Sequence, residues 1–426
     1  MKHSSPRVEI RDRNDGPLRE DGTDISVHLL EYDSAGFVKR KRYANLYGTP
    51  RLNAEKVFGY QYETDALGLV LARESTDFTG AVGPDARGIV RTISKHDDRG
   101  LLVETAFLGK DERPLANDDG CARILLARDA DGNSIETKCF GADGKGAYRK
   151  DGCSKSTTQY DDSGNAMVVA CFGVDDKLVL NKRGFARATS KYDSRGNEIE
   201  QTYFGTDGNP VHKKLGQTRT TQQYDDRGHL DRQSYFGIDG KPVLHKDGVA
   251  SFKQLYDERG NNVEIKYFGI DGKPVLHKDR YASVTRRYDE RGNNVEIKYF
   301  GIDGKPVLHK DGYASVTRVY DERGDNVKIK YFGIDGKLVV TKDGYAQVEH
   351  HFDERGDETL RYYFGVDGKP ILGKDGYARF AKSYDATGKV EKQTYFDAGG
   401  REVPGPSTTG TKAKQRDITL EEDGEP

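Results

Sequence analysis

The sequence of 426 residues contains no tryptophan, two methionines and four cysteines. It has no apolar run of the ~18–20 residues that a membrane-spanning helix needs, and its N-terminus lacks the apolar segment of a secretory signal. Lysine and arginine (68) balance aspartate and glutamate (70), so a net charge of −2 argues against a general attraction to nucleic acid or anionic membranes. We expect a soluble chain without membrane insertion, cytoplasmic by default unless it is exported without a cleavable signal.

The low hydrophobic content limits the kind of core that the chain can build. Hydrophobic residues make up 34% and charged residues 32%, which is too polar for one large globular core but sufficient for a thin one. Glycine is the outlier, with 50 residues, and tyrosine (25) and phenylalanine (17) supply the aromatic side chains. This composition favours β-structure with many tight turns.

One unit of 32 residues recurs about twelve times along the chain. Residues 256–287 and 288–319 are identical except at two positions, as expected after a duplication. An aspartate recurs at every step of 32 from Asp33 to Asp385, and a glycine follows it by three residues in all twelve copies, from Gly36 to Gly388. A fixed period of this length indicates a repeat architecture.

Each unit reads as a β-hairpin followed by a connector. The segment from Asp289 to Gly292 fits a tight turn in which the aspartate accepts backbone hydrogen bonds and the glycine takes a left-handed conformation. Apolar and polar residues alternate on both sides of this turn, the pattern of half-buried strands. The following stretch, residues 299–314, contains two further turns, and Pro306 limits it to an edge strand or an irregular connector.

Identical repeats need an even number of strands, so that every copy meets the same surroundings. The sequence therefore predicts an all-β fold of tandem hairpins stacked into an elongated ribbon or solenoid-like rod. Residues 1–25 and 402–426 lack the pattern and are predicted to be disordered tails. Residues 26–127 are predicted to be degenerate capping repeats, and residues 128–401 the regular array.

The Tyr-Asp-x-x-Gly-Asn hairpins, as at residues 256–261 and 192–197, resemble the YD repeats of bacterial RHS proteins. That resemblance covers residues ~32–400 and implies a spiralling β-sheet shell, which in bacteria often encloses a toxin. No toxin domain or self-cleavage segment is evident after residue 400. The Tyr-Phe-Gly-x-Asp-Gly-Lys element also looks like hairpins of bacterial cell-wall-binding repeats, whose sites depend on the tryptophan that this chain lacks.

The four cysteines form two pairs one repeat apart, Cys121 with Cys153 and Cys139 with Cys171. They stand at positions that hold tyrosine in other repeats, and we favour the interpretation that they are small apolar substitutes at buried sites. The alternatives are a metal site or disulfides between neighbouring repeats. Equivalent positions lie roughly 10 Å apart, too far for a disulfide, whereas Cys139 with Cys153 or Cys121 with Cys139 remains open. No Cys-x-x-Cys spacing supports zinc.

Two side-chain ladders are the candidate binding residues. For the tyrosine ladder we favour a core role, with a stacking platform for sugars as the alternative, because adjacent Tyr and Phe point to opposite faces of a strand. For the histidine ladder we favour a solvent-facing position copied by duplication, with metal binding or pH sensing as the alternative. The candidates are Tyr235, Tyr267, Tyr299, Tyr331, Tyr363, His245, His277 and His309.

No motif for catalysis, cofactor binding or a metal site is present. There is no nucleophile elbow, phosphate loop or His-Glu-x-x-His, and the repeated aspartates lack the spacing of a calcium loop. We therefore expect a non-enzymatic scaffold without a cofactor that binds a protein or a polysaccharide through a repeated β surface. The alternatives are a shell or spacer part of an RHS-like polymorphic toxin, or a carbohydrate- or cell-wall-binding module.

Overall fold

The computed structural model describes residues 7–9, 25–45, 47–212, 216–385 and 390–406. This part of the chain is all-β, and it contains no helix that could cross a membrane. Its 26 strands belong to one sheet in which each strand pairs antiparallel with its neighbours in sequence. The prediction of an all-β stack of tandem hairpins, with two strands per repeat, is confirmed.

The strand bounds repeat at the period found in the sequence. The strands are β1 (Arg7–Glu9), β2 (Val27–Tyr32), β3 (Val38–Ala44), β4 (Gly59–Thr64), β5 (Val70–Thr76), β6 (Arg91–His96), β7 (Leu102–Leu108), β8 (Arg123–Arg128), β9 (Ser134–Phe140), β10 (Lys155–Tyr160), β11 (Ala166–Phe172), β12 (Arg187–Tyr192), β13 (Glu198–Phe204), β14 (Arg219–Tyr224), β15 (Leu230–Phe236), β16 (Ser251–Tyr256), β17 (Asn262–Phe268), β18 (Ser283–Tyr288), β19 (Asn294–Phe300), β20 (Ser315–Tyr320), β21 (Asn326–Phe332), β22 (Gln347–Phe352), β23 (Glu358–Phe364), β24 (Arg379–Tyr384), β25 (Val390–Phe396) and β26 (Glu402–Val403). We number the repeats from 1 to 12 by their turn aspartates, from Asp33 in repeat 1 to Asp385 in repeat 12.

The hairpin tip, the turn that joins the two strands of a repeat, is held by its aspartate. In repeat 9, Asp289 Oδ1 accepts hydrogen bonds from the backbone N–H groups of Arg291 and Asn293, both at 2.9 Å. Gly292 has φ of 85°, in the left-handed region that a side chain would strain. The Arg291 guanidinium then donates to the backbone carbonyl of Glu322 in the next tip at 2.8 Å. The tips are therefore tied to one another along one edge of the sheet.

The connector, which we define as the residues between one hairpin and the next, forms the other edge. In residues 301–314, Gly301 N–H donates to Lys305 O at 2.8 Å and His309 N–H donates to Tyr313 O at 2.7 Å, which closes the two predicted turns. Pro306 makes only an isolated bridge with Phe300, as its missing N–H requires. Lys310 Nζ lies 2.6 Å from Asp279 Oδ1 of the preceding connector. Successive connectors are therefore linked as well.

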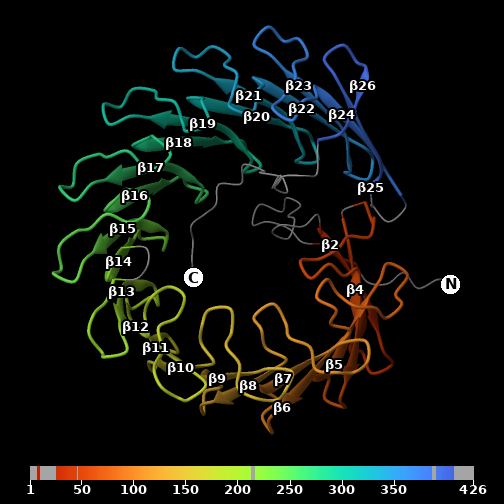
Figure 1. Cartoon of the computed structure of the whole chain (residues 1–426), viewed down its shortest axis with the longest axis vertical. Coiled ribbons are helices and arrows are strands. Elements are labelled where there is room, and N and C mark those ends of the chain that lie inside the picture. The colour runs from red at the N-terminus through yellow and green to blue at the C-terminus, as the bar shows by residue number, and fades with distance from the viewer. Residues whose placement is uncertain (1–6, 10–24, 46, 213–215, 386–389, 407–426) are drawn as a thin grey trace.

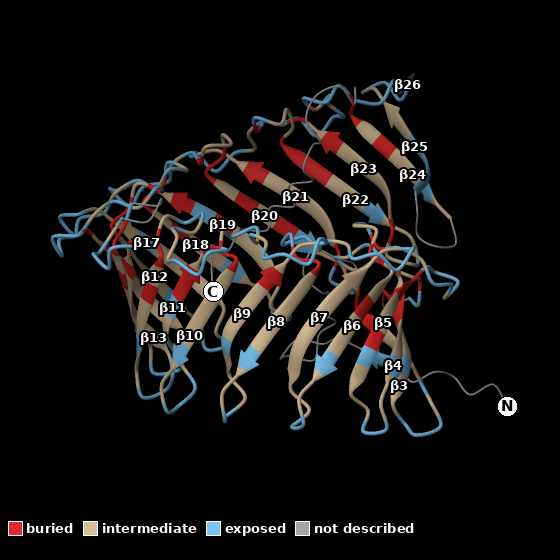
Figure 2. Cartoon of the chain, turned by 60° about the horizontal axis from the view of Figure 1, so that its bottom comes forward, coloured by how far each residue is buried: buried red, intermediate tan, exposed pale blue. Residues whose placement is uncertain are grey.

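Each hairpin has one buried face and one half-exposed face. Val284, Ile297 and Tyr299 point to the buried face and belong to the main core cluster. Phe300, next in sequence, lies half-buried on the opposite face. Basic side chains cover this phenylalanine position in several repeats, and the Arg187 guanidinium carbon lies 4.6 Å from the centre of the Phe204 ring. Figure 2 shows buried segments recurring in most hairpins of the ribbon.

The ribbon is curved, so that its first strands come round to the side of its last strands and a central opening remains (Figure 1). Each strand twists relative to its neighbour, and a long series of such steps accumulates into a turn. The contact between the ends is made by side chains and loops. Arg51 Nη2 of the first connector lies 2.5 Å from Asp357 Oδ1 in the tip of repeat 11. The stacked-hairpin ribbon thus follows the path of a ring.

Two short strands form within residues 1–25 and 402–426, which were predicted to be disordered tails. β1 pairs with β2, with Val8 opposite His28, and β26 pairs with β25, with Glu402 opposite Phe396. An uncovered edge strand presents unpaired N–H and C=O groups, and these short strands cover the two ends of the array. The remainder of the predicted tails, residues 1–6, 10–24 and 407–426, lies outside the described residues.

Candidate functional site

The tyrosine ladder lies in the core. Four of its five candidate residues are buried, and Tyr267 is half-buried. The ring of Tyr299 is 2% exposed and packs 4.8 Å from Tyr281 and 5.9 Å from Tyr313, measured between ring centres. The favoured interpretation as core is confirmed for the buried members, which offer no open face for a sugar ring.

The histidine ladder packs on the tyrosines, so its predicted solvent-facing position is wrong. The rings of His245 and Tyr235 stack with centres 4.8 Å apart, and His309 lies at the same distance from Tyr299. Burial lowers the pKa of His309, although Asp311 and Asp279 nearby oppose this shift. Sequence reasoning missed this burial because the connector folds back onto the hairpin. A binding role for the eight candidate residues stays a prediction.

The four cysteines form two disulfides, Cys121–Cys139 and Cys153–Cys171, with Cα atoms 5.4 and 5.3 Å apart. Each bond joins a residue two positions before the first strand of a hairpin to the penultimate residue of its second strand. Tyr313 and Tyr331 occupy the same two positions in repeat 10, with ring centres 4.9 Å apart. The interpretation as unpaired apolar substitutes is therefore wrong, and the open pairing of Cys121 with Cys139 is correct. In repeats 4 and 5, one disulfide therefore replaces the tyrosine pair at the base of each hairpin.

A set of exposed aliphatic residues on the connectors was missed in the sequence. Ile302 follows Gly301 in the first connector turn, a position where most turns carry polar residues, yet it is 61% exposed. Leu308, six residues later, is also exposed. Their counterparts recur in repeats 7 to 11, and we call the whole set the connector ladder: Ile238, Ile270, Ile302, Ile334, Val366, Leu244, Leu276, Leu308, Val340 and Leu372. The signal that could have found it is a β-branched residue kept inside a Gly-x-Asp-Gly turn.

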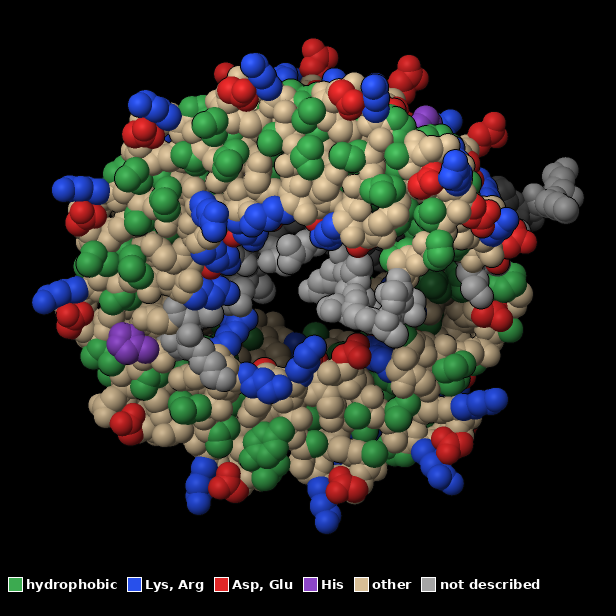
Figure 3. All heavy atoms as spheres, turned by 45° about the horizontal axis from the view of Figure 1, so that its top comes forward, with side chains coloured by type: hydrophobic (Ala, Val, Ile, Leu, Met, Phe, Trp, Pro, Cys, Tyr) green, Lys and Arg blue, Asp and Glu red, His purple; other side chains and the backbone are tan. Residues whose placement is uncertain are grey.

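The connector ladder follows the ring. Two strands per repeat advance each connector by about 10 Å. Figure 3 shows hydrophobic side chains recurring round the ring, inside an outer row of paired basic and acidic side chains. Lys305 and Asp303, in the same connector as Ile302, form an ion pair with Nζ and Oδ2 3.7 Å apart. Single exposed aliphatic residues are ordinary on protein surfaces, but a regular series of them along one edge is a candidate interaction surface.

A buried group of charged side chains distinguishes repeat 11. Glu358 accepts a hydrogen bond from Arg361 Nε at 2.8 Å and lies 2.7 Å from His350 Nδ1 and 3.7 Å from Lys382 Nζ. Burial alone would raise the pKa of Glu358, but His350 and Arg361 outweigh it and lower this pKa to about 2. Burial also lowers the pKa of Lys382. The carboxylate stays ionised and holds three nitrogen-bearing side chains together.

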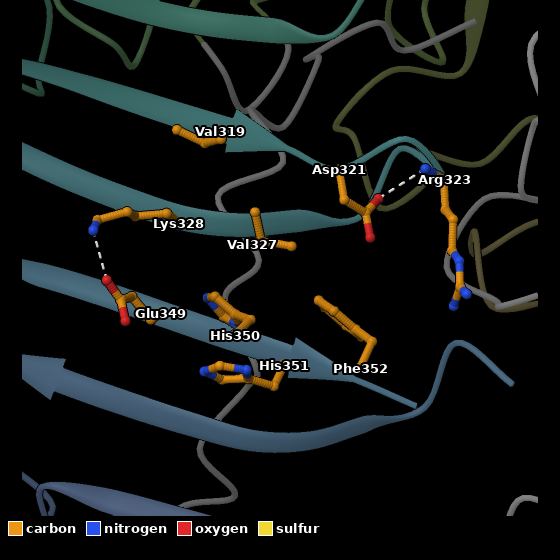
Figure 4. Close-up of a pocket in the computed structure, with 9 residues that line it drawn as sticks. All are labelled: Val319, Asp321, Arg323, Val327, Lys328, Glu349, His350, His351 and Phe352. Atoms are coloured by element: carbon orange, nitrogen blue, oxygen red, sulfur yellow. Dashed lines mark hydrogen bonds and ion pairs between the residues drawn. The ribbon is translucent and has the colours of Figure 1, made fainter. Parts of the chain in front are cut away.

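A shallow groove of about 380 Å³ lies beside this group, across β20, β21 and β22 (Figure 4). Its lining combines apolar side chains with an ion pair between Lys328 Nζ and Glu349 Oε1, 2.6 Å apart. The lining residues are Val319, Asp321, Arg323, Val327, Lys328, Glu349, His350, His351 and Phe352. Across the described residues, no group of three or more histidine, cysteine, aspartate or glutamate side chains is arranged to hold a metal ion.

Comparison with known proteins gives no match to a family model and none to a curated protein sequence. Among solved structures, the chain is similar to the crystal structure of TcdB2-TccC3-Cdc42, with 12% identity over 88% of this chain and 21% of that chain, and a TM-score of 0.37. It is also similar to TcdB2-TccC3, with 13% identity over 88% of this chain and 23% of that chain, and a TM-score of 0.30. A Photorhabdus luminescens Tc holotoxin pore gives 12% identity over 87% and 23%, with a TM-score of 0.28.

The chain spans less than a quarter of the length of these three chains. At such TM-scores the likeness carries no argument about function. What this chain does must therefore be argued from its own surfaces.

Proposed function

We propose that this chain is a non-enzymatic scaffold that binds a protein partner through its connector ladder. The supporting observation is the series of aliphatic side chains, between 41% and 61% exposed, that recurs on five consecutive connectors. Covering such side chains removes apolar area from water and favours association. Repetition along the ring gives many equivalent contacts, each weak, that act together.

The chemistry of this surface favours a protein over a polysaccharide. Isoleucine, leucine and valine offer no hydrogen bonds to sugar hydroxyls, and burying a hydroxyl without a hydrogen bond is costly. The aromatic rings that could stack on a sugar, such as Tyr299 and Tyr331, are in the core. The matching partner surface is therefore an apolar stripe on a protein.

The test replaces Ile270, Ile302 and Ile334 together with threonine, which keeps the branched shape and adds a hydroxyl. The control replaces Lys273, Lys305 and Lys337 in the same connectors with glutamine. We expect proteins retained by the immobilised chain from its native host to be lost with the threonine variant and kept with the glutamine variant. Identical retention by the two variants, or retention of purified peptidoglycan by the unmodified chain, would count against the proposal.

A second candidate function is the wall of an RHS-like shell. The observation that favours it is the curvature of the ribbon around a central opening, with its ends in contact (Figures 1 and 3). A shell protects what it encloses. A folded cargo joined to the C-terminus should then resist proteases that digest the same cargo alone, and equal digestion would count against the shell.

We also propose that the chain works in an oxidising compartment, outside the cytoplasm. Disulfides persist in secreted and periplasmic proteins and are rare where glutathione and thioredoxin keep thiols reduced. The pairs Cys121–Cys139 and Cys153–Cys171 support this location. Trapping of thiols in intact cells should find all four cysteines oxidised in the native host. Reduced cysteines in the cytosolic fraction would instead support the cytoplasmic location expected from the sequence.

A further inference from the structure

The two ends of the array meet at a defined seam. Arg51 of the first connector pairs with Asp357 in the tip of repeat 11, and both residues are buried. Asn45 Nδ2 donates a hydrogen bond to the backbone carbonyl of Arg355 in the same tip. Tyr47 reaches the tip of repeat 10, where the Arg323 guanidinium carbon lies 5.3 Å from the centre of its ring.

The fit at this seam is close. Gly356 has φ of 77°, and a Cβ added there would come within 2.6 Å of the Tyr47 ring. Burial raises the pKa of the Tyr47 hydroxyl, and the nearby carboxylate of Asp325 adds to this effect. Tyr47 is thus seated between the tips of two consecutive repeats.

The residues on the connector side of the seam depart from the repeat. Hydrogen bonding aligns Asn45, which donates to Thr49 O, with Gly301, which donates to Lys305 O. By this alignment Tyr47 stands where repeat 9 has Asp303, and Arg51 stands where it has Val307. Val307 packs against the core cluster. An arginine at that position would bury an unpaired charge unless a carboxylate came from elsewhere.

The residues on the tip side depart from the repeat as well. The position after the tip glycine is asparagine in repeats 4, 5, 6, 8 and 9, and it is aspartate only in repeats 10 and 11, as Asp325 and Asp357. In repeat 9 the Asn293 amide donates to Asp289 Oδ2 at 3.0 Å. Aspartate cannot donate this hydrogen bond and places a second carboxylate beside the tip aspartate. Within its own hairpin the change is unfavourable.

The departures from the repeat on the two sides of the seam have one common explanation. Each one is costly or neutral inside its own repeat. Across the seam, Arg51 pairs with Asp357. Tyr47 lies against Arg323 and close to Asp325. We infer that Tyr47 and Arg51 on one side, and Asp325 and Asp357 on the other, form a latch that closes the array into a single turn at one register. Repeat 1 is locked onto repeats 10 and 11 because only those two tips carry a carboxylate at the position after the tip glycine. Curvature brings the ends near one another, and the latch selects which repeats join.

The test uses substitutions that return each latch residue to the residue of the regular repeats: Tyr47→Asp, Arg51→Val, Asp325→Asn and Asp357→Asn. These residues already occur at equivalent positions of folded hairpins, so loss of folding does not confound the result. Spin labels at Thr79→Cys and Glu322→Cys, both exposed, report the distance across the seam. We expect a single narrow distance in the parent chain and a longer, broader distribution in the fourfold variant.

Two controls separate the latch from general weakening. Asn261→Asp with Asn293→Asp makes the reverse exchange in tips away from the seam, which gives them the aspartate of repeats 10 and 11, and should leave the distance unchanged. The exchange Arg51→Asp with Asp357→Arg should recover much of the narrow distribution that either single change loses. An unchanged distance in the fourfold variant, with circular dichroism showing intact β-structure, would overturn the latch.

Discussion

Arg51 Nη2 lies 2.5 Å from Asp357 Oδ1, although the two residues are 306 positions apart in the sequence. Both side chains are about nine-tenths buried, 10% and 8% exposed. The strands of the described sheet pair only with their neighbours in sequence. The ends are therefore coupled by side chains, through this pair together with the contacts of Asn45 and Tyr47. The contact between the first connector and the tip of repeat 11 therefore forms only when the hairpins between them are folded.

The tip aspartates should make stability fall in acid. Hydrogen bonds from the side chain and the backbone N–H of Asn165 lower the pKa of Asp161, and those of Asn197 do the same for Asp193. A carboxyl whose pKa is lowered on folding contributes its stabilisation fully above the unfolded pKa of about 4, and this is lost as the pH falls through the folded pKa. Thermal unfolding should therefore be level near neutral pH and decline below about pH 4.

A matched variant isolates this effect at one tip. Asn165→Ala removes the amide that favours ionised Asp161, so its decline in acid should be shallower than that of the parent chain. Hydrogen exchange of residues 160–166 at two pH values would measure it. The same acid dependence in both chains would show that the tip hydrogen bonds are not its source.

The tyrosine ladder should make stability fall in alkali. Burial raises the pKa of Tyr331 to about 12, and burial also raises those of Tyr281 and Tyr313. A tyrosine whose pKa is raised on folding contributes fully below the unfolded pKa of about 10 and loses that contribution as the pH rises through the folded value. Tyrosinate absorbance should therefore rise in two steps, the second together with loss of β-structure. A single step near pH 10 with the sheet intact would contradict this.

Adjacent aromatic residues of one strand should differ in their contribution to stability. Tyr299→Ala empties a site that is 2% exposed and should lower the free energy of unfolding by about 3–5 kcal/mol. Phe300→Ala, the matched control on the half-exposed face, should lower it by much less. Denaturant unfolding, with hydrogen exchange to localise the change, would measure both. Equal losses would mean that the two faces are equally buried in solution.

Reduction of the disulfides should weaken repeats 4 and 5 alone. Each bond closes a loop with a sequence separation of 18, which corresponds to about 3 kcal/mol of stabilisation. Hydrogen exchange after reduction should accelerate in residues 123–172 and remain unchanged in residues 283–332. The double variant Cys121→Tyr with Cys139→Tyr restores the tyrosine pair of repeat 10 and should fold without the first disulfide. Uniform acceleration along the chain would show that the disulfides support the ring as a whole.

The local structure followed from the sequence because its causes are local. The period fixed two strands per repeat, and the aspartate and glycine of each tip, such as Asp289 and Gly292, have the predicted turn geometry. The burial of His309 could not be predicted, because it depends on how the connector folds back over Tyr299.

The residue pattern alone did not decide between a straight rod and a ring, although the resemblance to YD repeats implied a spiralling shell. Curvature is the sum of many small twists between neighbouring strands, and no single residue sets it. The signal that was present is the aspartate at 325 and 357, where five other tips carry asparagine. Its meaning appears only when the structure brings Arg51 to that tip.

Closure at the seam also depends on the number of repeats in the array. Residues 256–287 and 288–319 are near-copies, the kind of tandem sequence that recombination removes or adds one unit at a time. In most repeat proteins such a change only shortens or lengthens the array. Here, loss of one copy would bring a different tip opposite Arg51 and leave Asp357 one place away. Closure at one register therefore restricts the number of repeats, whereas the sequence of an individual repeat can still change.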